Sequence, residues 1–307
     1  MATPVVTVAA GGLPIVDVTA TFPKLGLPVT EAPNGRGVAV TKVAANGLPV
    51  TFKAAGNEWP FPPNPPPISG GGGGPFTPAS LTGLIGWWDT SVFASMSLLG
   101  GTDINTMLDQ SGAVNTMSAF NQYPFYSATG LNTRPAMLLN SGTKALHKTS
   151  FALGTGNTLT VFCVATLDSA GTGAYGRLLS YKAATGSNDA DNNGSFMFAR
   201  DNANNGMALY RNGSAATKAM AANATFRCIA TIDASGVMTI YIDGAPATGG
   251  ALNAAFVSGG ELAIGCQAIA WNSAWKGAIA EIGIATGFTN ATDVASLDTY
   301  LKNKWGL

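Results

Sequence analysis

Residues 226–246 read Phe-Arg-Cys-Ile-Ala-Thr-Ile-Asp-Ala-Ser-Gly-Val-Met-Thr-Ile-Tyr-Ile-Asp-Gly-Ala-Pro, and this stretch decides the fold class of the chain. A β-branched apolar run is followed by an Asp-Ala-Ser-Gly turn, a second such run and an Asp-Gly turn. In the second run Val237, Thr239 and Tyr241 share one face, and the three apolar residues that alternate with them share the other. The stretch therefore predicts two antiparallel strands joined by a tight turn.

The same strand-and-turn pattern extends on both sides of this hairpin. Many short apolar runs alternate with Gly- and Asn-rich turns, and in one domain of this size they predict an all-β fold. We expect a two-sheet antiparallel jelly-roll sandwich over residues 80–307. Further strands are predicted at residues 158–167, 177–181, 195–200, 207–211, 261–266 and 278–285.

One helix is predicted, at the C-terminal end. Asn290 can cap its first turn, with Asp293 three residues later. Apolar residues then recur at helical spacing on one face, namely Val294, Leu297, Leu301 and Trp305. The pattern favours a helix that packs on the sandwich over one that binds a partner.

Composition limits the classes of partner. The 307 residues include only 10% charged residues, and the formal net charge is zero. No basic surplus indicates nucleic acid, and no apolar run approaches the length of a membrane span. The first residues have no positive segment followed by an apolar core, so no Sec-type signal is expected.

The three cysteines Cys163, Cys228 and Cys266 each lie in an apolar run. An odd number without close spacing is a poor disulfide framework and no metal motif. We expect buried free thiols, typical of a protein made in a reducing cytoplasm.

A proline- and glycine-rich stretch, residues 59–79, divides the chain. Its prolines favour extended polyproline II, about 25 Å long for residues 60–67, and the five glycines that follow add a flexible part. We expect a linker between an N-terminal segment, residues 1–58, and a large domain, residues 80–307.

The N-terminal segment contains a Gly-Leu-Pro motif three times, beginning at Gly12, Gly26 and Gly47. Short β-prone runs and Asn-Gly turns lie between the copies, so a small extended or β segment is predicted. About sixty residues of this kind make a small core. Either the segment relies on a partner surface, in an oligomer or on a scaffold, or it is a self-contained sheet domain.

Three further motifs are similar to those of a known protein family. They are residues 84–91 (Leu-Ile-Gly-Trp-Trp-Asp-Thr-Ser), residues 107–112 (Met-Leu-Asp-Gln-Ser-Gly) and residues 133–138 (Thr-Arg-Pro-Ala-Met-Leu). With the hairpin at residues 226–246 and the C-terminal helix, the large domain resembles concanavalin A-like (laminin G-like) domains. The resemblance implies the sandwich fold but no particular ligand. The combination with the N-terminal array resembles a bacteriophage virion protein.

The sequence gives little support for an enzyme. Glycosidases of the resembled fold carry a Glu-x-Asp-x-Glu strand with paired carboxylates. Residues 80–307 contain two glutamates, Glu261 and Glu281, neither within such a motif, and the single histidine is His147. Hydrolysis is therefore the less favoured reading.

Two loops are candidate binding sites. Asp189, Asp191 and Asn193 offer closely spaced oxygen ligands of the kind calcium binds, but they lack the ordered spacing of an EF-hand, and a solvated polar loop is the favoured alternative. No other cofactor is expected. Trp271, Asn272 and Trp275 form the second candidate, because aromatic faces stack on sugar rings and amides bind hydroxyl groups. The alternative is that the two tryptophans pack the end of the sandwich.

These observations lead to one functional hypothesis and its alternatives. We expect a structural virion protein, a capsid decoration or head-fibre subunit on the virion surface that is made in the host cytoplasm. Residues 1–58 would dock on capsid or other virion proteins and form a homo-oligomer, preferably a trimer, while the sandwich contacts cell-surface glycans. The alternatives are a phage tail-fibre or receptor-binding protein, a secreted glycan-binding or glycan-hydrolysing protein, and a bacterial adhesin.

Overall fold

The computed structural model describes residues 76–139, 143–168, 175–186, 188–190, 194–201, 206–221, 223–268, 272–287 and 290–307, and the backbone of four strands nearer the N-terminus. The chain divides into two units, Met1–Pro62 and Pro63–Leu307. Each unit is described by itself.

The N-terminal unit contains two antiparallel strand pairs. β1 (Val5–Val8) pairs with β2 (Pro14–Asp17), and β3 (Ala39–Val43) pairs with β4 (Pro49–Lys53). β2 and β4 both begin at the proline of a Gly-Leu-Pro motif, a position where the missing N–H of proline is tolerated. The β character of this segment is therefore confirmed; the second motif copy, at Gly26, lies outside the described residues.

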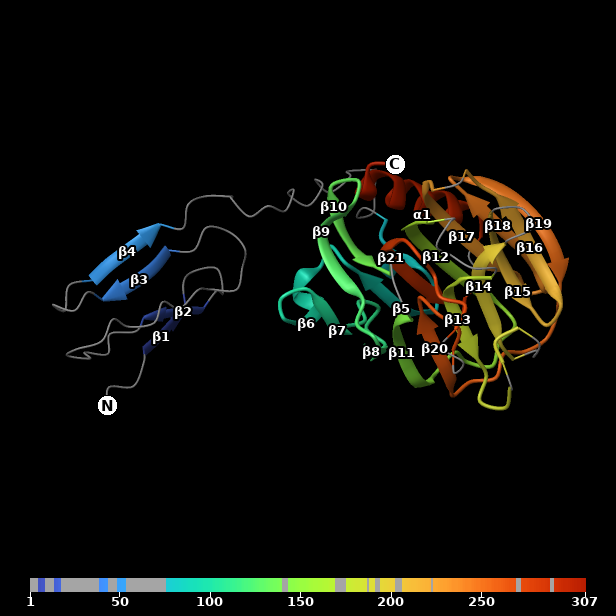
Figure 1. The fold of residues 1–307 in the computed structure, drawn as a ribbon, viewed down its shortest axis with the longest axis horizontal. Helices are drawn as coiled ribbons and strands as arrows, with labels where there is room; N and C mark the ends of the chain where they lie inside the picture. The colour runs from blue at the N-terminus through green and yellow to red at the C-terminus, as the bar shows by residue number, and fades with distance from the viewer. Residues whose placement is uncertain are drawn as a thin grey trace. The chain divides into compact units, whose positions relative to one another are not determined.

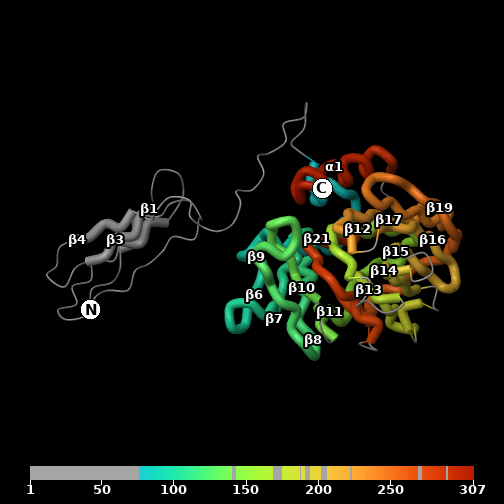
Figure 2. The backbone as a smooth tube through the Cα atoms, turned by 45° about the horizontal axis from the view of Figure 1, so that its top comes forward, coloured from blue at the N-terminus to red at the C-terminus, as the bar shows by residue number. Residues whose placement is uncertain are grey.

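The large unit is an antiparallel β-sandwich, as predicted (Figures 1 and 2). In the first sheet the order is β19-β18-β17-β12-β21, with β5 and β10 sharing the far edge of β21 and β9 beside β10. Its strands are β5 (Leu84–Asp89), β9 (Phe125–Leu131), β10 (Arg134–Leu138), β12 (Leu159–Thr166), β17 (Thr225–Ile232), β18 (Val237–Ile242), β19 (Ala245–Ala251) and β21 (Ala278–Ala285).

The second sheet has the order β16-β15-β14-β13-β20-β11-β8-β7-β6. Its strands are β6 (Met96–Leu99), β7 (Asp103–Met107), β8 (Met117–Asn121), β11 (Lys144–Phe151), β13 (Arg177–Lys182), β14 (Phe196–Asp201), β15 (Gly206–Arg211), β16 (Ser214–Ala219) and β20 (Gly260–Ile264). Two short 3-10 helices are also present: η1 (Pro78–Ser80) precedes β5, and η2 (Phe93–Ser95) lies between β5 and β6. β7 also pairs with β9 at Asp103 and Phe125, which joins the two sheets.

The hairpin that decided the fold class has the predicted form. β17 and β18 pair antiparallel, and Met238, Ile240 and Ile242 are buried while the residues between them are half-buried. β12 is buried on both faces, which accounts for its continuous apolar run. On this strand Cys163 lies directly opposite Cys228 of β17, and all three cysteines are buried free thiols, as expected.

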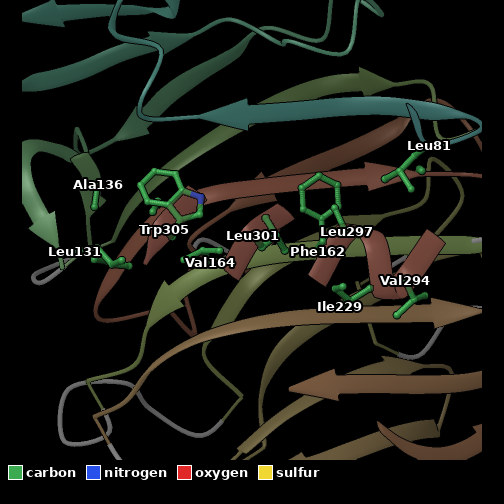
Figure 3. Packing of buried hydrophobic residues seen from close by; sticks show 13 residues of the cluster. Leu81, Leu131, Ala136, Phe162, Val164, Ile229, Val294, Leu297, Leu301 and Trp305 are labelled. Atoms are coloured by element: carbon green, nitrogen blue, oxygen red, sulfur yellow. The ribbon is translucent and has the colours of Figure 1, made fainter. Parts of the chain in front are cut away.

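The predicted C-terminal helix is confirmed as α1 (Ala291–Trp305). The Asn290 side chain caps it by accepting a hydrogen bond from the Asp293 N–H, and Gly306 ends it in the left-handed conformation. α1 covers one face of the first sheet (Figure 3). The buried helix residues are Val294, Leu297, Leu301 and Trp305, and they pack with Phe162, Val164 and Ile229. Among the described residues, no helix has the length and apolar character of a membrane span.

Candidate functional site

A buried ion pair lies at the start of β13. The Arg177 guanidinium donates from Nε to Oδ2 of Asp189 at 3.0 Å and from Nη2 to Oδ1 at 3.3 Å. Ser180 Oγ donates to Oδ2 at 2.7 Å and Gln267 Nε2 to Oδ1 at 3.0 Å. Four donors therefore surround the Asp189 carboxylate, which is fully buried.

This environment bears on the calcium candidate. Asp189 is engaged by the cation and the two polar side chains above, while Asp191 and Asn193 lie outside the described residues. Within the part of the chain that the structure describes, no three His, Cys, Asp or Glu side chains are grouped to hold a metal ion. Calcium binding by this loop stays a prediction.

Arg177 also joins the two loops that flank the ion pair. Its Nη1 donates to the carbonyl oxygen of Tyr175 at 2.6 Å, and its backbone N–H donates to the carbonyl oxygen of Ser273 at 2.8 Å. A parallel bridge between Arg177 and Ala274 continues this contact. The Gln267 N–H donates to the carbonyl oxygen of Asn272 at 3.0 Å, so a hydrogen bond also joins the two ends of the loop between these residues. Arg177 thereby links the segment of Tyr175 to the loop of Asn272 and Ser273.

Tyr175 is an exposed aromatic residue in an unusual backbone conformation. Tyr175 is 44% exposed, and its φ of 57° is left-handed, as is the φ of 48° at Ser273. Such angles are costly for a bulky side chain, so the contacts around Tyr175 must hold it in this conformation. The Tyr175 ring meets the Tyr210 ring edge-on, with 5.5 Å between centroids. Tyr210 in turn donates its hydroxyl to Oδ1 of Asp201 at 3.3 Å.

The three residues of the tryptophan candidate have different environments in the structure. Trp275 is 1% exposed, its Nε1 donates to the Thr166 carbonyl oxygen at 3.1 Å, and its ring packs against Phe226. The Trp275 indole is therefore enclosed and offers no open face to a sugar. This burial agrees with the alternative that Trp275 packs the sandwich. Asn272 is exposed beside the site, and Trp271 lies outside the described residues.

Sequence reasoning did not single out Tyr175. Its only local signal is a tyrosine between small residues, Gly-Ala-Tyr-Gly at 173–176. Arg177 and Tyr210 were read only as parts of strands. Their roles arise from contacts between segments that are distant in the sequence.

A second buried polar cluster surrounds Glu281 of β21. Oε1 accepts hydrogen bonds from Trp87 Nε1 at 2.7 Å and from the Tyr300 hydroxyl at 3.1 Å. Oε2 accepts from Trp305 Nε1 at 2.6 Å and lies 3.0 Å from Lys304 Nζ. Burial raises the pKa of Glu281, because a charge away from water is costly, and Lys304 opposes this effect.

Lys304 completes the cluster. Its ammonium group donates to Asp89 Oδ2 and, at 2.8 Å, to the Tyr300 hydroxyl, besides its contact with Glu281. Burial alone would lower the pKa of Lys304, but Glu281 and Asp89 outweigh burial and raise it. All three N–H donors of the ammonium are used, and the Glu281 carboxylate is fully enclosed. The cluster therefore fastens α1 to the sheet and leaves no open acid for catalysis.

Comparison with known proteins defines the fold. The large unit is similar to domain 4 of AbnA, an extracellular arabinanase from Geobacillus stearothermophilus solved with arabinotriose, with a TM-score of 0.52 and 13% identity over 70% of this chain and 98% of that one. It is also similar to Trypanosoma rangeli sialidase in complex with sialic acid, with a TM-score of 0.50 and 12% identity over 78% of this chain and 36% of the sialidase. The match thus spans about a third of the sialidase. No curated protein matches the sequence.

A sequence model of a protein family also matches the chain and assigns it to a superfamily. The model of the concanavalin A-like lectin/glucanases superfamily matches residues 140–295, which is half of the chain. This region contains the hairpin, the Arg177–Asp189 pair and the loop of Asn272. The fold is one that serves carbohydrate-binding and glycan-active proteins, and the chain belongs to the concanavalin A-like lectin/glucanases superfamily.

Proposed function

We propose that the sandwich is a carbohydrate-binding domain without catalytic activity, and that Tyr175, Asn272 and Ser273 form its contact surface. The observation that carries this proposal is the exposed Tyr175, in a left-handed backbone conformation, on a segment that Arg177 bonds to the loop of the exposed Asn272. A folded chain keeps such a costly conformation only where the surroundings hold it in place.

The chemistry of these groups suits a sugar. The face of an aromatic ring packs against the C–H groups of a pyranose or furanose ring, and amide and hydroxyl side chains bind its hydroxyl groups. The Ser273 hydroxyl donates to Asn272 Oδ1 at 3.2 Å, and the loop that carries both polar groups is bonded to Arg177, two residues after Tyr175. One ring and two short polar side chains give weak binding to a single site, which several linked copies strengthen by avidity.

The proposed lack of hydrolysis rests on the carboxylates. Among the described residues, Glu281 is enclosed by four donors, Asp189 by another four, and Glu261 lies 3.2 Å from His147 Nδ1. A glycosidase needs two carboxyl groups that face a sugar across an open cleft. None of these three carboxylates is placed in that way.

For the whole chain we propose a structural virion protein, a capsid decoration or head-fibre subunit on the virion surface. What supports this proposal is the sequence layout: residues 1–58 with their repeated motif, the linker at 59–79, and a lectin-like domain beyond it. In this arrangement residues 1–58 bind capsid or other virion proteins and hold a homo-oligomer, preferably a trimer, together. The displayed domains then contact cell-surface glycans.

Binding and turnover are tested on the full chain with soluble polyacrylamide polymers that carry glucose, galactose, mannose or N-acetylglucosamine. We expect at least one polymer to bind, with weaker binding of the matching free sugar, and no release of sugar on prolonged incubation. Failure of all four polymers, together with blank results on a broad glycan array, would overturn the carbohydrate-binding proposal. Release of sugar that depends on Glu281 or Asp189 would favour the hydrolytic alternative.

The oligomer is tested by measuring mass in solution. Light scattering of the full chain is expected to give three times the mass of the 31.1 kDa chain, and a variant that lacks residues 1–58 is expected to give the mass of one chain. A trimer that survives the deletion would place the oligomer contacts elsewhere in the chain.

A further inference from the structure

We infer that Arg177 and Asp189 are positioning residues for the proposed carbohydrate surface: they hold Tyr175 in the conformation that binds the sugar. This inference rests on the proposed function, since it assigns the residues that organise the same surface. Neither residue is proposed to touch the ligand, because both are buried.

The first argument is the direction of the Arg177 hydrogen bonds. The side chain divides its donors between the Asp189 carboxylate and the carbonyl oxygen of Tyr175, while its backbone N–H binds the carbonyl oxygen of Ser273. Both acceptor residues have left-handed φ angles, 57° and 48°. One arginine therefore contacts both residues of the surface that have left-handed φ angles.

The second argument is the support behind Arg177. Asp189 is fixed by Ser180 of β13 and by Gln267, which follows β20, and the Gln267 N–H holds the carbonyl oxygen of Asn272. β13 and β20 are paired strands in the middle of the second sheet. The Arg177–Asp189 ion pair and its neighbours Ser180 and Gln267 thus connect Tyr175 and Asn272 to these two strands.

The third argument is energetic. A buried Arg–Asp pair adds little stability compared with apolar residues of the same size, because the desolvation of both charges offsets their attraction. A rigid, planar guanidinium does, however, fix the geometry of several acceptors at once. Holding a binding residue in its bound conformation improves affinity by reducing the entropy lost on binding. The pair is therefore suited to organising the surface.

A double-mutant cycle separates positioning from a general effect on folding. Tyr175→Ala is measured in the wild-type chain and in Arg177→Lys, with the best-binding of the four sugar polymers as the probe. We expect Tyr175→Ala to weaken binding about tenfold in the wild type and less than about twofold in Arg177→Lys, where the ring is no longer held. Equal factors in both backgrounds would contradict positioning. No effect of Tyr175→Ala in the wild type would instead reject the proposed function.

A second measurement needs no sugar. Chymotrypsin cleaves after exposed tyrosines in mobile loops, so Arg177→Lys and Asp189→Asn are expected to be cut after Tyr175 at least about fivefold faster than the wild type. Gly283→Ala, a core substitution away from this site, is the control for lost stability, with urea melts to match the variants. If cleavage after Tyr175 is no faster in Arg177→Lys than in Gly283→Ala at matched stability, the inference is wrong.

Discussion

Trp305 Nε1 donates a 2.6 Å hydrogen bond to Oε2 of Glu281, so the last turn of the C-terminal helix is bonded to β21 in the first sheet. Both groups are buried, and Trp87 and Tyr300 bind the other carboxylate oxygen. Helix α1 is therefore held by its apolar face and by a polar cluster at its C-terminal end.

Trp305→Phe keeps an aromatic ring but removes the indole donor to Glu281. We expect a loss of about 1–3 kcal/mol in the free energy of unfolding, because a buried carboxylate oxygen loses a hydrogen bond. Urea denaturation measures the change, and Lys302→Ala, at an exposed position of the same helix, is the control. Equal stability of Trp305→Phe and the control would show that this bond contributes nothing.

Lys304→Met leaves two buried carboxylates, Asp89 and Glu281, without their shared cation. Removing one partner of a buried ion pair costs about 3–5 kcal/mol, so the variant is expected to be much less stable at pH 7. The loss should shrink toward pH 4, because burial raises the pKa of Glu281 and protonation of this carboxyl group removes its uncompensated charge. Thermal unfolding of the wild type and the variant at both pH values tests this dependence, and a loss that does not change with pH would contradict it.

Stability is expected to decline at alkaline pH. Burial raises the pKa of the Cys266 thiol from 9.0 to about 12, and burial also raises the pKa of Tyr300. A group with a higher pKa in the folded state holds its proton there while the unfolded chain releases it. The free energy of unfolding therefore falls as pH rises above about 9. Unfolding at pH 8 and pH 11 measures this fall, and Cys266→Ala should reduce it. An unchanged slope in Cys266→Ala would exclude this thiol as a cause.

Gly283 of β21 lies against the ring of Phe162, and a Cβ at this position would be 2.2 Å from the ring atom Cζ. Gly283→Ala is expected to destabilise the domain by about 1–3 kcal/mol, since the packed core cannot accept the extra methyl group. Gly156→Ala is the matched control, because a Cβ there would have no neighbour within 4 Å. Chemical denaturation of the two variants should separate them clearly; similar midpoints would mean that the Phe162 ring can move aside.

The sequence predicted those elements whose signals are local. The hairpin at residues 226–246 follows from alternation and turn residues, and α1 follows from its cap and helical spacing. β12 and β21 were found because strands buried on both faces are continuously apolar. β11 was missed, because its polar residues, such as His147 and Lys148, interrupt the apolar pattern.

The candidate site was less accessible to sequence reasoning. Asp189 and Asn272 were singled out as polar loop residues, but their neighbours are set by chain folding: Asp189 binds Gln267, 78 residues away. Residue type alone does not distinguish an exposed from a buried aromatic ring, so the sequence left open whether Trp275 contacts a sugar or packs the end of the sandwich, and in the structure it is enclosed. Tyr175, rather than Trp275, is the exposed aromatic residue at this site.

The most direct test of carbohydrate binding at the Tyr175 surface is the affinity of Tyr175→Ala for the sugar polymer that binds the wild-type chain. Tyr123→Ala is the matched control, because Tyr123 is 41% exposed and lies outside the proposed surface. We predict that Tyr175→Ala weakens binding about tenfold with little change in Tm, while Tyr123→Ala binds like the wild type. Wild-type affinity in Tyr175→Ala, or an equal loss in both variants, would contradict a carbohydrate site at Tyr175.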